Sequence, residues 1–225
     1  MALFYLYCML GLLAFVLLVF YLLAKHRDVE WGKPGLNALD GLIRLFLRYY
    51  HRAKWQRIPL PEHGPALVVA NHVSGLDPLL LIAASPRPLR FLIADEQYDR
   101  FFLHFFFRSA DAIRVDRDHH PERAVRQALQ ALNKGEVVMI FPHGHIHLDS
   151  DAPHGIKRGA VKLSQWSGAP IYPCRIDGVK GEGDIMLALF QRGQPRLTTA
   201  APVTCHSESE KQCTDELLKI IESKV

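Results

Sequence analysis

A histidine and an aspartate five positions apart form the first group in this sequence whose side chains are suited to chemistry. His72 follows one apolar run, and Asp77 stands directly before Pro78 and a second apolar run. A carboxylate bonded to one imidazole nitrogen fixes the tautomer and stabilises the imidazolium that forms when the other nitrogen takes a proton. The pair therefore suits a general base and requires no serine or cysteine nucleophile. A polar turn between a strand and a helix gives the same two-residue pattern, so the rest of the chain has to decide.

Short apolar elements on either side would hold this pair in place. The β-branched run over 67–70 predicts a buried strand that ends just before His72. Asp77 followed by Pro78 is typical of an N-cap and a first helical residue, and it predicts a helix over 78–84. The end of the strand and the start of the helix would then bring the imidazole beside the carboxylate.

From residue 60 onward, short strand-like runs alternate with longer helical patterns. This alternation predicts an α/β fold with a partly parallel central sheet flanked by helices. Gly135, directly after Lys134, marks the end of one helix. The predicted strands cover 67–70, 89–93, 112–115, 137–141, 171–176 and 196–200, and the predicted helices cover 78–84, 121–134, 159–167 and 209–223.

The first 24 residues contain no charged residue and no proline. As a helix they would measure roughly 36 Å, enough to cross the hydrocarbon core of a bilayer. A cleaved signal peptide is the alternative, but the segment lacks a basic n-region and a cleavage pattern. Lys25, His26 and Arg27 follow directly, so the positive-inside rule predicts that the remainder lies on the cytoplasmic face of the membrane.

A second helical pattern follows this apolar segment. Its apolar positions recur at helical spacing, and arginines recur along one flank at 44, 48 and 52. Such a helix fits either the headgroup region of a membrane or a packed position on the domain, and periodicity does not separate the two. The sequence thus predicts a membrane helix over 1–27, a linker with an amphipathic interfacial helix over 28–59, and an α/β domain over 60–225.

The composition excludes several classes of protein. The chain has 225 residues, of which 49% are hydrophobic and 22% charged, enough for one sizeable domain plus an appendage. A net charge of +4 favours an anionic membrane or substrate, and no basic stripe interleaved with aromatic residues points to nucleic acid. The four cysteines form no close pair, so we expect neither a disulfide framework nor a zinc ribbon.

A dense aromatic block, FFLHFFF, covers residues 101–107 between two arginines. It is too short to span a bilayer. Such a block fits a helix buried under the sheet or a surface that meets acyl chains, and aromatic residues are more often part of a core.

Four separated blocks follow one another in the second and third quarters of the chain. They read N-H-x4-D-P at 71–78, A-I-R-V-D-R at 112–117, F-P-H-G at 141–144, and I-K-R-G-A then G-A-P-I-Y-P at 156–160 and 168–173. In this order and spacing they resemble the signature blocks of the glycerolipid acyltransferases related to 1-acylglycerol-3-phosphate acyltransferase. The resemblance implies transfer of a fatty acyl group from a thioester, of coenzyme A or acyl carrier protein, to a hydroxyl of a lysolipid at a membrane. It implies no metal, no cofactor and no nucleic acid.

The resemblance also assigns roles to single residues. His72 would take the hydroxyl proton while Asp77 holds it, and amides around Gly144 would stabilise the oxyanion. Arg117 matches an arginine that contacts the anionic headgroup of the acceptor, because a guanidinium fork suits phosphate; a surface ion pair is its alternative. Lys157 would add positive charge to this acceptor site, although it also fits the phosphates of the donor or a solvated loop.

The third block departs from the family pattern, which reads Phe-Pro-Glu-Gly-Thr-Arg. His143, the fourth residue expected in the acceptor site, replaces the glutamate, and His145 and Ile146 replace the threonine and arginine. Lysine or histidine elsewhere would imitate the lost bidentate donor poorly. The acceptor is therefore open between lysophosphatidic acid and a lysolipid with another headgroup.

The same segment supports a different class of function. His143, His145, His147 and Asp149 alternate, so in an extended chain they would share one face, and imidazole and carboxylate ligands bind zinc. A metal-dependent hydrolase is thus one alternative, and a catalytically inactive membrane lipid-binding protein is another. A catalytic metal site normally draws ligands from several elements, and a hydrolase would leave the four blocks unexplained.

Overall fold

The computed structural model of this chain describes residues 1–98, 107–117, 119–148, 155–205 and 210–223. Within these residues a seven-stranded sheet has the order β1-β7-β6-β2-β5-β3-β4. All its neighbouring strands run parallel except β6 and β7. The strands are β1 (Lys54–Trp55), β2 (Ala66–Ala70), β3 (Leu89–Ala94), β4 (Ile113–Val115), β5 (Val137–Ile140), β6 (Ile171–Asp177) and β7 (Arg196–Thr199).

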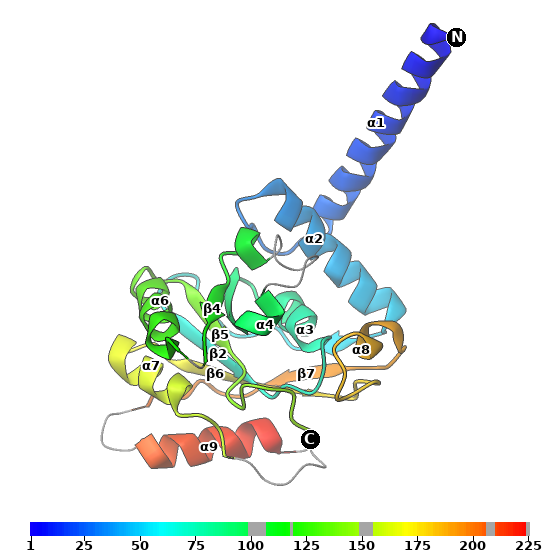
Figure 1. Cartoon of the computed structure of the whole chain (residues 1–225). Helices are drawn as coiled ribbons and strands as arrows, with labels where there is room; N and C mark the ends of the chain where they lie inside the picture. Colours follow the sequence, from blue (N-terminus) through cyan, green and yellow to red (C-terminus); the bar gives the residue numbers. More distant parts are fainter. Residues whose placement is uncertain (99–106, 118, 149–154, 206–209, 224–225) are drawn as a thin grey trace.

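Helices cover both faces of the sheet (Figure 1). One hydrophobic core lies between the sheet and α2 and α3, and a second lies between the sheet and α6, α7 and α9. The predicted α/β fold with a mostly parallel sheet is therefore confirmed. The helices are α1 (Ala2–Lys25), α2 (Pro34–Leu45) with the π-helical turn η1 (Phe46–Tyr50), α3 (Asp77–Ala84), α4 (Asp95–Tyr98), α6 (Pro121–Asn133), α7 (Gly159–Ser167), α8 (Leu187–Phe190) and α9 (Glu210–Glu222).

Strand β2 lies at the centre of the sheet, and all five of its residues are buried. Val68 packs in the core beneath α2 and α3, whereas Val69 packs in the core beneath α6, α7 and α9. Both faces of the strand are covered, which explains why its sequence is a continuous apolar run rather than an alternating one. His72 and Asp77, which follow β2, are therefore held by a strand that is packed on both faces.

Strand β1 was not predicted, because two residues carry too little periodicity to be recognised. It pairs with β7, with Lys54 opposite Arg196, so the sheet begins before residue 60. The aromatic block falls almost entirely on residues 101–106, outside the described residues; Phe107 alone is described.

Two of the four cysteines form a disulfide, contrary to the expectation that spacing excludes a disulfide framework. Cys205 and Cys213 are buried, and their Cα atoms lie 5.8 Å apart. Helix α9 begins between them in the chain and returns Cys213 to the core, a proximity that a spacing of eight does not reveal. Of the remaining two, Cys8 is exposed, and burial raises the pKa of Cys174 to about 12.

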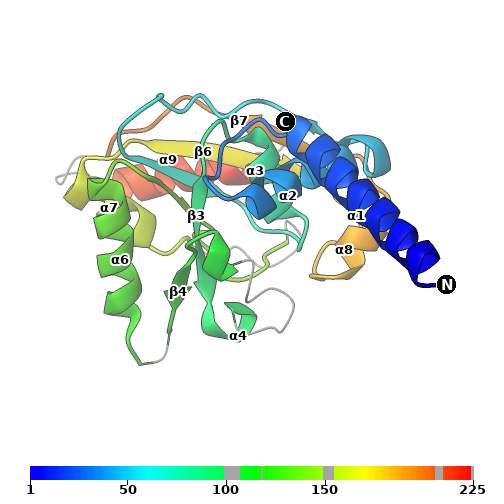
Figure 2. The ribbon, with the colours of Figure 1, turned by 90° about the horizontal axis from the view of Figure 1, so that it is seen from above.

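Helix α1 leads away from the sheet, as the two views agree (Figures 1 and 2). It is long and apolar enough to cross a membrane, and none of that apolar stretch is buried in the protein. Its last turn packs against α2 so closely that a Cβ on Gly41 would overlap the carbonyl of Leu23. This contact fixes the start of the domain to the end of α1.

Helix α2 packs on the domain, which is one of its two predicted positions. Arg44, one of the three arginines on the basic flank, is buried and bonds to Asp40, with 2.7 Å between Nε and Oδ2. Its Nη1 donates to the carbonyl of Ala83 at the end of α3, at 2.7 Å. Ile43 is buried beside it, whereas Tyr49 and Tyr50 of η1 remain exposed.

Replacing Gly41 with alanine tests the contact between α1 and α2. The added Cβ would overlap the Leu23 carbonyl, and overpacking of this kind costs about 1–3 kcal/mol. We expect limited trypsin digestion after Lys25 and Arg27 to become faster than in the wild type. Gly35→Ala, also in α2 but with open space around the new Cβ, is the matched control. Equal digestion rates in the two variants would contradict a tight contact.

Candidate active site

His72 and Asp77 meet at the carboxyl end of β2, where the chain turns into α3. The Nδ1 atom of His72 lies 2.8 Å from Oδ2 of Asp77. The same oxygen accepts the amides of Val73 and Ser74, at 2.7 and 2.8 Å, and Oδ1 accepts the Ser74 hydroxyl at 2.8 Å. The carboxylate is completely buried, so these bonds replace its lost water.

The helix begins one residue earlier than predicted. Asp77 is the first residue of α3 and Leu76 its N-cap, so the expectation that Asp77 caps the helix is wrong. The physical reason is that both oxygens of Asp77 already accept bonds from the preceding turn and from His72. The carboxylate therefore organises the turn rather than the helix.

Two further contacts hold His72, one to its ring and one to its backbone. Its ring stacks on Phe141 of the third block, with centroids 4.0 Å apart and planes 16° apart. Its backbone carbonyl accepts the amide of His147 at 2.7 Å. With Nδ1 directed at the carboxylate, Nε2 is the nitrogen left for a substrate proton, and 20% of the side chain remains exposed. The geometry matches that of a general base held in one tautomer.

Asn71 and Gly75 position this turn, and neither was assigned a separate role from the sequence. The Asn71 side chain bonds both the amide and the carbonyl of Ile176, at 2.7 and 2.8 Å, and so ties the end of β2 to β6. Gly75 donates to the carbonyl of Asp184, and a Cβ on it would overlap the carbonyl of Ile185. Asn71 and Ile176 are 105 positions apart, so no local sequence pattern could have revealed this pairing.

Three of the four expected acceptor residues come together beside Phe141. The Arg117 guanidinium donates to the carbonyl of Gly144. The Lys157 side chain lies over the same glycine, so that a Cβ there would stand 3.0 Å from Nζ. The backbone amide of Lys157 also donates to the carbonyl of Pro142, at 2.9 Å. Two cations thus converge on the turn that continues from Phe141.

Gly144 itself shapes that turn. Its φ of 80° lies in the left-handed region that favours glycine. Its amide donates to the carbonyl of Phe141, at 3.0 Å, so this amide, expected as an oxyanion donor, is already used within the turn. Asp116 and Asp118 are the two acidic neighbours that could form a surface ion pair with Arg117. Asp116 accepts the amide of His119, at 2.9 Å, and Asp118 lies outside the described residues.

His143 is placed apart from these three residues, against α9. Its side chain is 2% exposed, and Nε2 lies 3.4 Å from Oε1 of Glu222. Its ring stacks on His147 at 4.8 Å. Burial lowers the pKa of His143 below its ordinary value of 6.5, His147 adds to this shift, and Glu222 opposes it. The surroundings of His143 therefore favour a neutral imidazole inside the protein.

The predicted one-face arrangement of His143, His145, His147 and Asp149 is not found. The chain turns at Gly144 instead of continuing extended, and the His145 ring lies edge-on to His147 at 6.2 Å and 88°. Asp149 falls outside the described residues. Among the described residues, His143 and His147 instead join Glu222, with all three ligand atoms within 4.8 Å of one another. Two imidazoles and a carboxylate are a donor set that zinc uses.

Comparison with known proteins gives consistent results. A family model described as Acyltransferase matches residues 54–177. The 1-acyl-sn-glycerol-3-phosphate acyltransferase of Bacillus subtilis is 26% identical over 64% of this chain and 69% of that enzyme. A probable 1-acyl-sn-glycerol-3-phosphate acyltransferase of Mycoplasma pneumoniae is 33% identical over 62% of this chain, which spans 55% of the relative. The crystal structure of PlsC, the 1-acyl-sn-glycerophosphate acyltransferase of Thermotoga maritima, has a TM-score of 0.62, 19% identity, and coverage of 91% of this chain and 92% of its own.

Replacing Asp77 with asparagine tests the structural part of this site. The amide group would leave at least one of the donors from His72, Val73 and Ser74 without an acceptor, and a buried unpaired donor costs about 1–3 kcal/mol. We expect the free energy of unfolding in urea to fall by that amount. Ser74→Ala removes the hydroxyl that donates to Oδ1 and accepts the amide of Leu76, but it leaves the carboxylate and its bonds to His72, Val73 and the Ser74 amide in place, so it should cost less. If the two variants lost equal stability, the carboxylate would not be organising the turn.

Metal analysis tests the histidine and glutamate group. The planes of His143 and His147 are 20° apart in a stack, an arrangement that does not direct both rings toward one ion. We therefore expect the purified chain to hold no stoichiometric zinc by elemental analysis. A bound ion whose occupancy falls in His147→Ala and Glu222→Gln, but not in the His145→Ala control, would overturn this expectation.

Proposed function

The chain belongs to the acyltransferase family, and from this premise we propose that it transfers a fatty acyl group from a thioester to the hydroxyl of a lysolipid, with His72 as general base. The predicted enzyme class is confirmed by the family match and by the related acyltransferases. The observation that carries the proposed mechanism is the 2.8 Å contact between Nδ1 of His72 and the fully buried carboxylate of Asp77.

The reaction then proceeds by direct attack. Nε2 of His72 takes the proton of the lysolipid hydroxyl as its oxygen attacks the carbonyl carbon of the thioester. The tetrahedral oxyanion collapses, the carbon–sulfur bond breaks, and the imidazolium returns the proton to the leaving thiolate. Asp77 stabilises the imidazolium between these two steps. No acyl group is attached to the enzyme.

An anionic lysolipid of the lysophosphatidate type is the acceptor that we propose. Arg117 and Lys157 supply two cations beside Phe141, which itself stacks on His72. Guanidinium and ammonium groups suit a phosphate headgroup. The names of the relatives support the same acceptor class. Ile146 stands where the family has an arginine, so this site has one cation fewer. Its positive charge comes from Arg117 and Lys157.

We further propose that the enzyme works at a membrane surface, on the cytoplasmic face. Helix α1 is apolar along its exposed length, Lys25 is its last residue, and Arg27 follows two positions later. Tyr49, Tyr50 and Phe190 are all exposed, and the Tyr50 hydroxyl donates to the backbone carbonyl of Phe190 at 2.6 Å. Aromatic residues of this kind favour the interface between lipid and water.

Replacing His72 with alanine tests the mechanism. Loss of a general base typically lowers turnover ~10²–10⁴-fold, and we expect a loss of this size while the melting temperature stays near the wild-type value. The assay uses labelled acyl-coenzyme A or acyl carrier protein with a panel of lysolipids.

The matched control is His63→Ala, an exposed histidine away from the site. Wild-type turnover in the His72→Ala variant would remove His72 from the mechanism. A wild-type chain that binds lysolipids in the panel and acylates none would support an inactive lipid-binding protein instead.

A further inference from the structure

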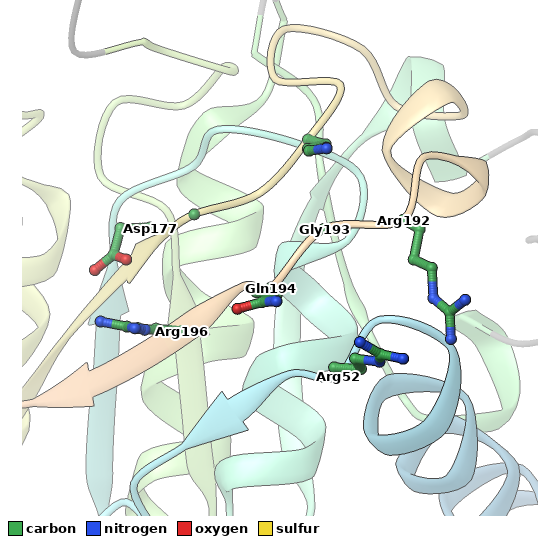
Figure 3. A pocket seen from close by; sticks show the side chains of 8 residues that line it. Arg52, Asp177, Arg192, Gly193, Gln194 and Arg196 are labelled. Carbon is green, nitrogen blue, oxygen red and sulfur yellow. The ribbon is translucent and has the colours of Figure 1, made fainter.

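A second group of cations lies at the same edge of the sheet, away from Arg117 and Lys157. It surrounds a cavity of about 510 Å³ between the end of β6, the start of β7 and the turn after η1. In Figure 3, Arg52 and Arg192 lie near each other at one end, and Arg196 and Asp177 lie at the other. With Lys180, four cations and one carboxylate line this cavity.

Of the four cationic side chains, Arg192 is hydrogen-bonded to the described part of the protein and the other three are not. Arg192 donates to the carbonyls of Tyr50 and Tyr49, at 2.7 and 3.3 Å. Within the part of the chain that the structure describes, the side chains of Arg52, Lys180 and Arg196 make no hydrogen bond or ion pair. Like charges that line one cavity, most of them without partners among the described residues, favour an anion bound among them.

The backbone around the cavity is unusually constrained. Arg52 has a φ of 52°, in the left-handed region that residues with a side chain rarely adopt. Gly178 has a φ of 67°, and a Cβ on it would stand 2.9 Å from the carbonyl oxygen of Gln194. The segments that line the cavity thus contain a strained residue and a close backbone contact. Strain of this kind is common at binding sites.

The cavity lies on the opposite side of His72 from the proposed acceptor site. Strands β6, β7 and β1 lie on one side of β2, and β5, β3 and β4 lie on the other. Arg117 follows β4 and Gly144 follows β5, whereas Asp177 ends β6 and Arg196 begins β7. The Asn71 bonds to Ile176 connect the catalytic turn directly to the residue before Asp177.

We propose that this cavity binds the phosphates of acyl-coenzyme A, which makes coenzyme A rather than acyl carrier protein the donor. This inference rests on the proposed acyl transfer, which brings two substrates to one base. The acceptor site takes one anion on the β5 side, so the second cationic site serves the other substrate. Four cations around about 510 Å³ match a nucleotide that carries several phosphates better than the single phosphodiester of a carrier protein arm.

A double variant, Arg52→Gln with Arg196→Gln, tests the site in the full-length chain. Titration calorimetry with coenzyme A itself should show about a tenfold or larger rise in Kd, because two charge-assisted contacts are removed. The KM for acyl-coenzyme A should rise similarly, while the KM for the lysolipid and kcat at saturating donor stay unchanged. Dephospho-coenzyme A should bind the wild type more weakly than coenzyme A.

Two controls separate this site from general loss of charge and from failure of the mechanism. Arg126→Gln, an exposed arginine on α6, should bind coenzyme A like the wild type. His72→Ala should also bind it normally while losing turnover. If His72→Ala is inactive and the double variant binds coenzyme A as the wild type does, the cavity proposal fails and the proposed function remains. If His72→Ala keeps its turnover, the mechanism fails, and the coenzyme A titrations still decide the cavity.

Other anions give distinguishable outcomes. Vesicles of phosphatidylcholine with and without phosphatidate measure whether the cavity takes a lipid headgroup. A double variant that loses binding to phosphatidate vesicles, with the Kd for coenzyme A unchanged, would overturn the proposal in favour of a membrane contact. Selective loss of activity with acyl carrier protein, but not with acyl-coenzyme A, would overturn it in favour of a protein donor.

Discussion

The Asp77 carboxylate has no contact with solvent, and a buried charge is tolerated only where bonds replace its hydration. The chain meets this requirement with one turn, in which two amides, a hydroxyl and an imidazole all contact the two oxygens. The position of this turn depends on β2, which is buried on both faces. Any shift of β2 would disrupt the packing of both hydrophobic cores. His72 is therefore held by the same packing that stabilises the fold.

The topology places the chemistry along one edge of a parallel sheet. Parallel strands end at the same edge, so the segments that follow β2, β4 and β5 meet although they are distant in the sequence. Phe141 illustrates the result, since it stacks on His72 while its turn receives Arg117 and Lys157. The antiparallel strand β7 adds Arg196 to the same edge from the other direction. One sheet edge thus carries the base with a cationic group on each side.

Sequence reasoning predicted much of this arrangement and missed the parts that have no local pattern. Most of the strands and helices were found because apolar periodicity is local, whereas the short elements β1, α4 and α8 were missed. The His72–Asp77 contact was found because both residues flank a single turn. The position of Arg44 was left open because its helical spacing is the same whether lipid or protein covers the helix, and its bond to the carbonyl of Ala83 in α3 forms only in the folded domain. The histidine cluster was wrong in geometry because a left-handed Gly144 breaks the extended alternation. Glu222 and the pairing of Cys205 with Cys213 were not found, since only the folded position of α9 brings them into contact.

The bonds between Asn71 and Ile176 span 105 positions and have a consequence for synthesis. Contacts of such long sequence separation form late, because the intervening chain must be ordered before they stabilise anything. During translation α1 emerges before β6, which is completed only when Asp177 has emerged. The nascent chain therefore carries its apolar helix before the turn that holds His72 is anchored to β6. The turn that presents His72 is therefore anchored only after β6 has joined the sheet.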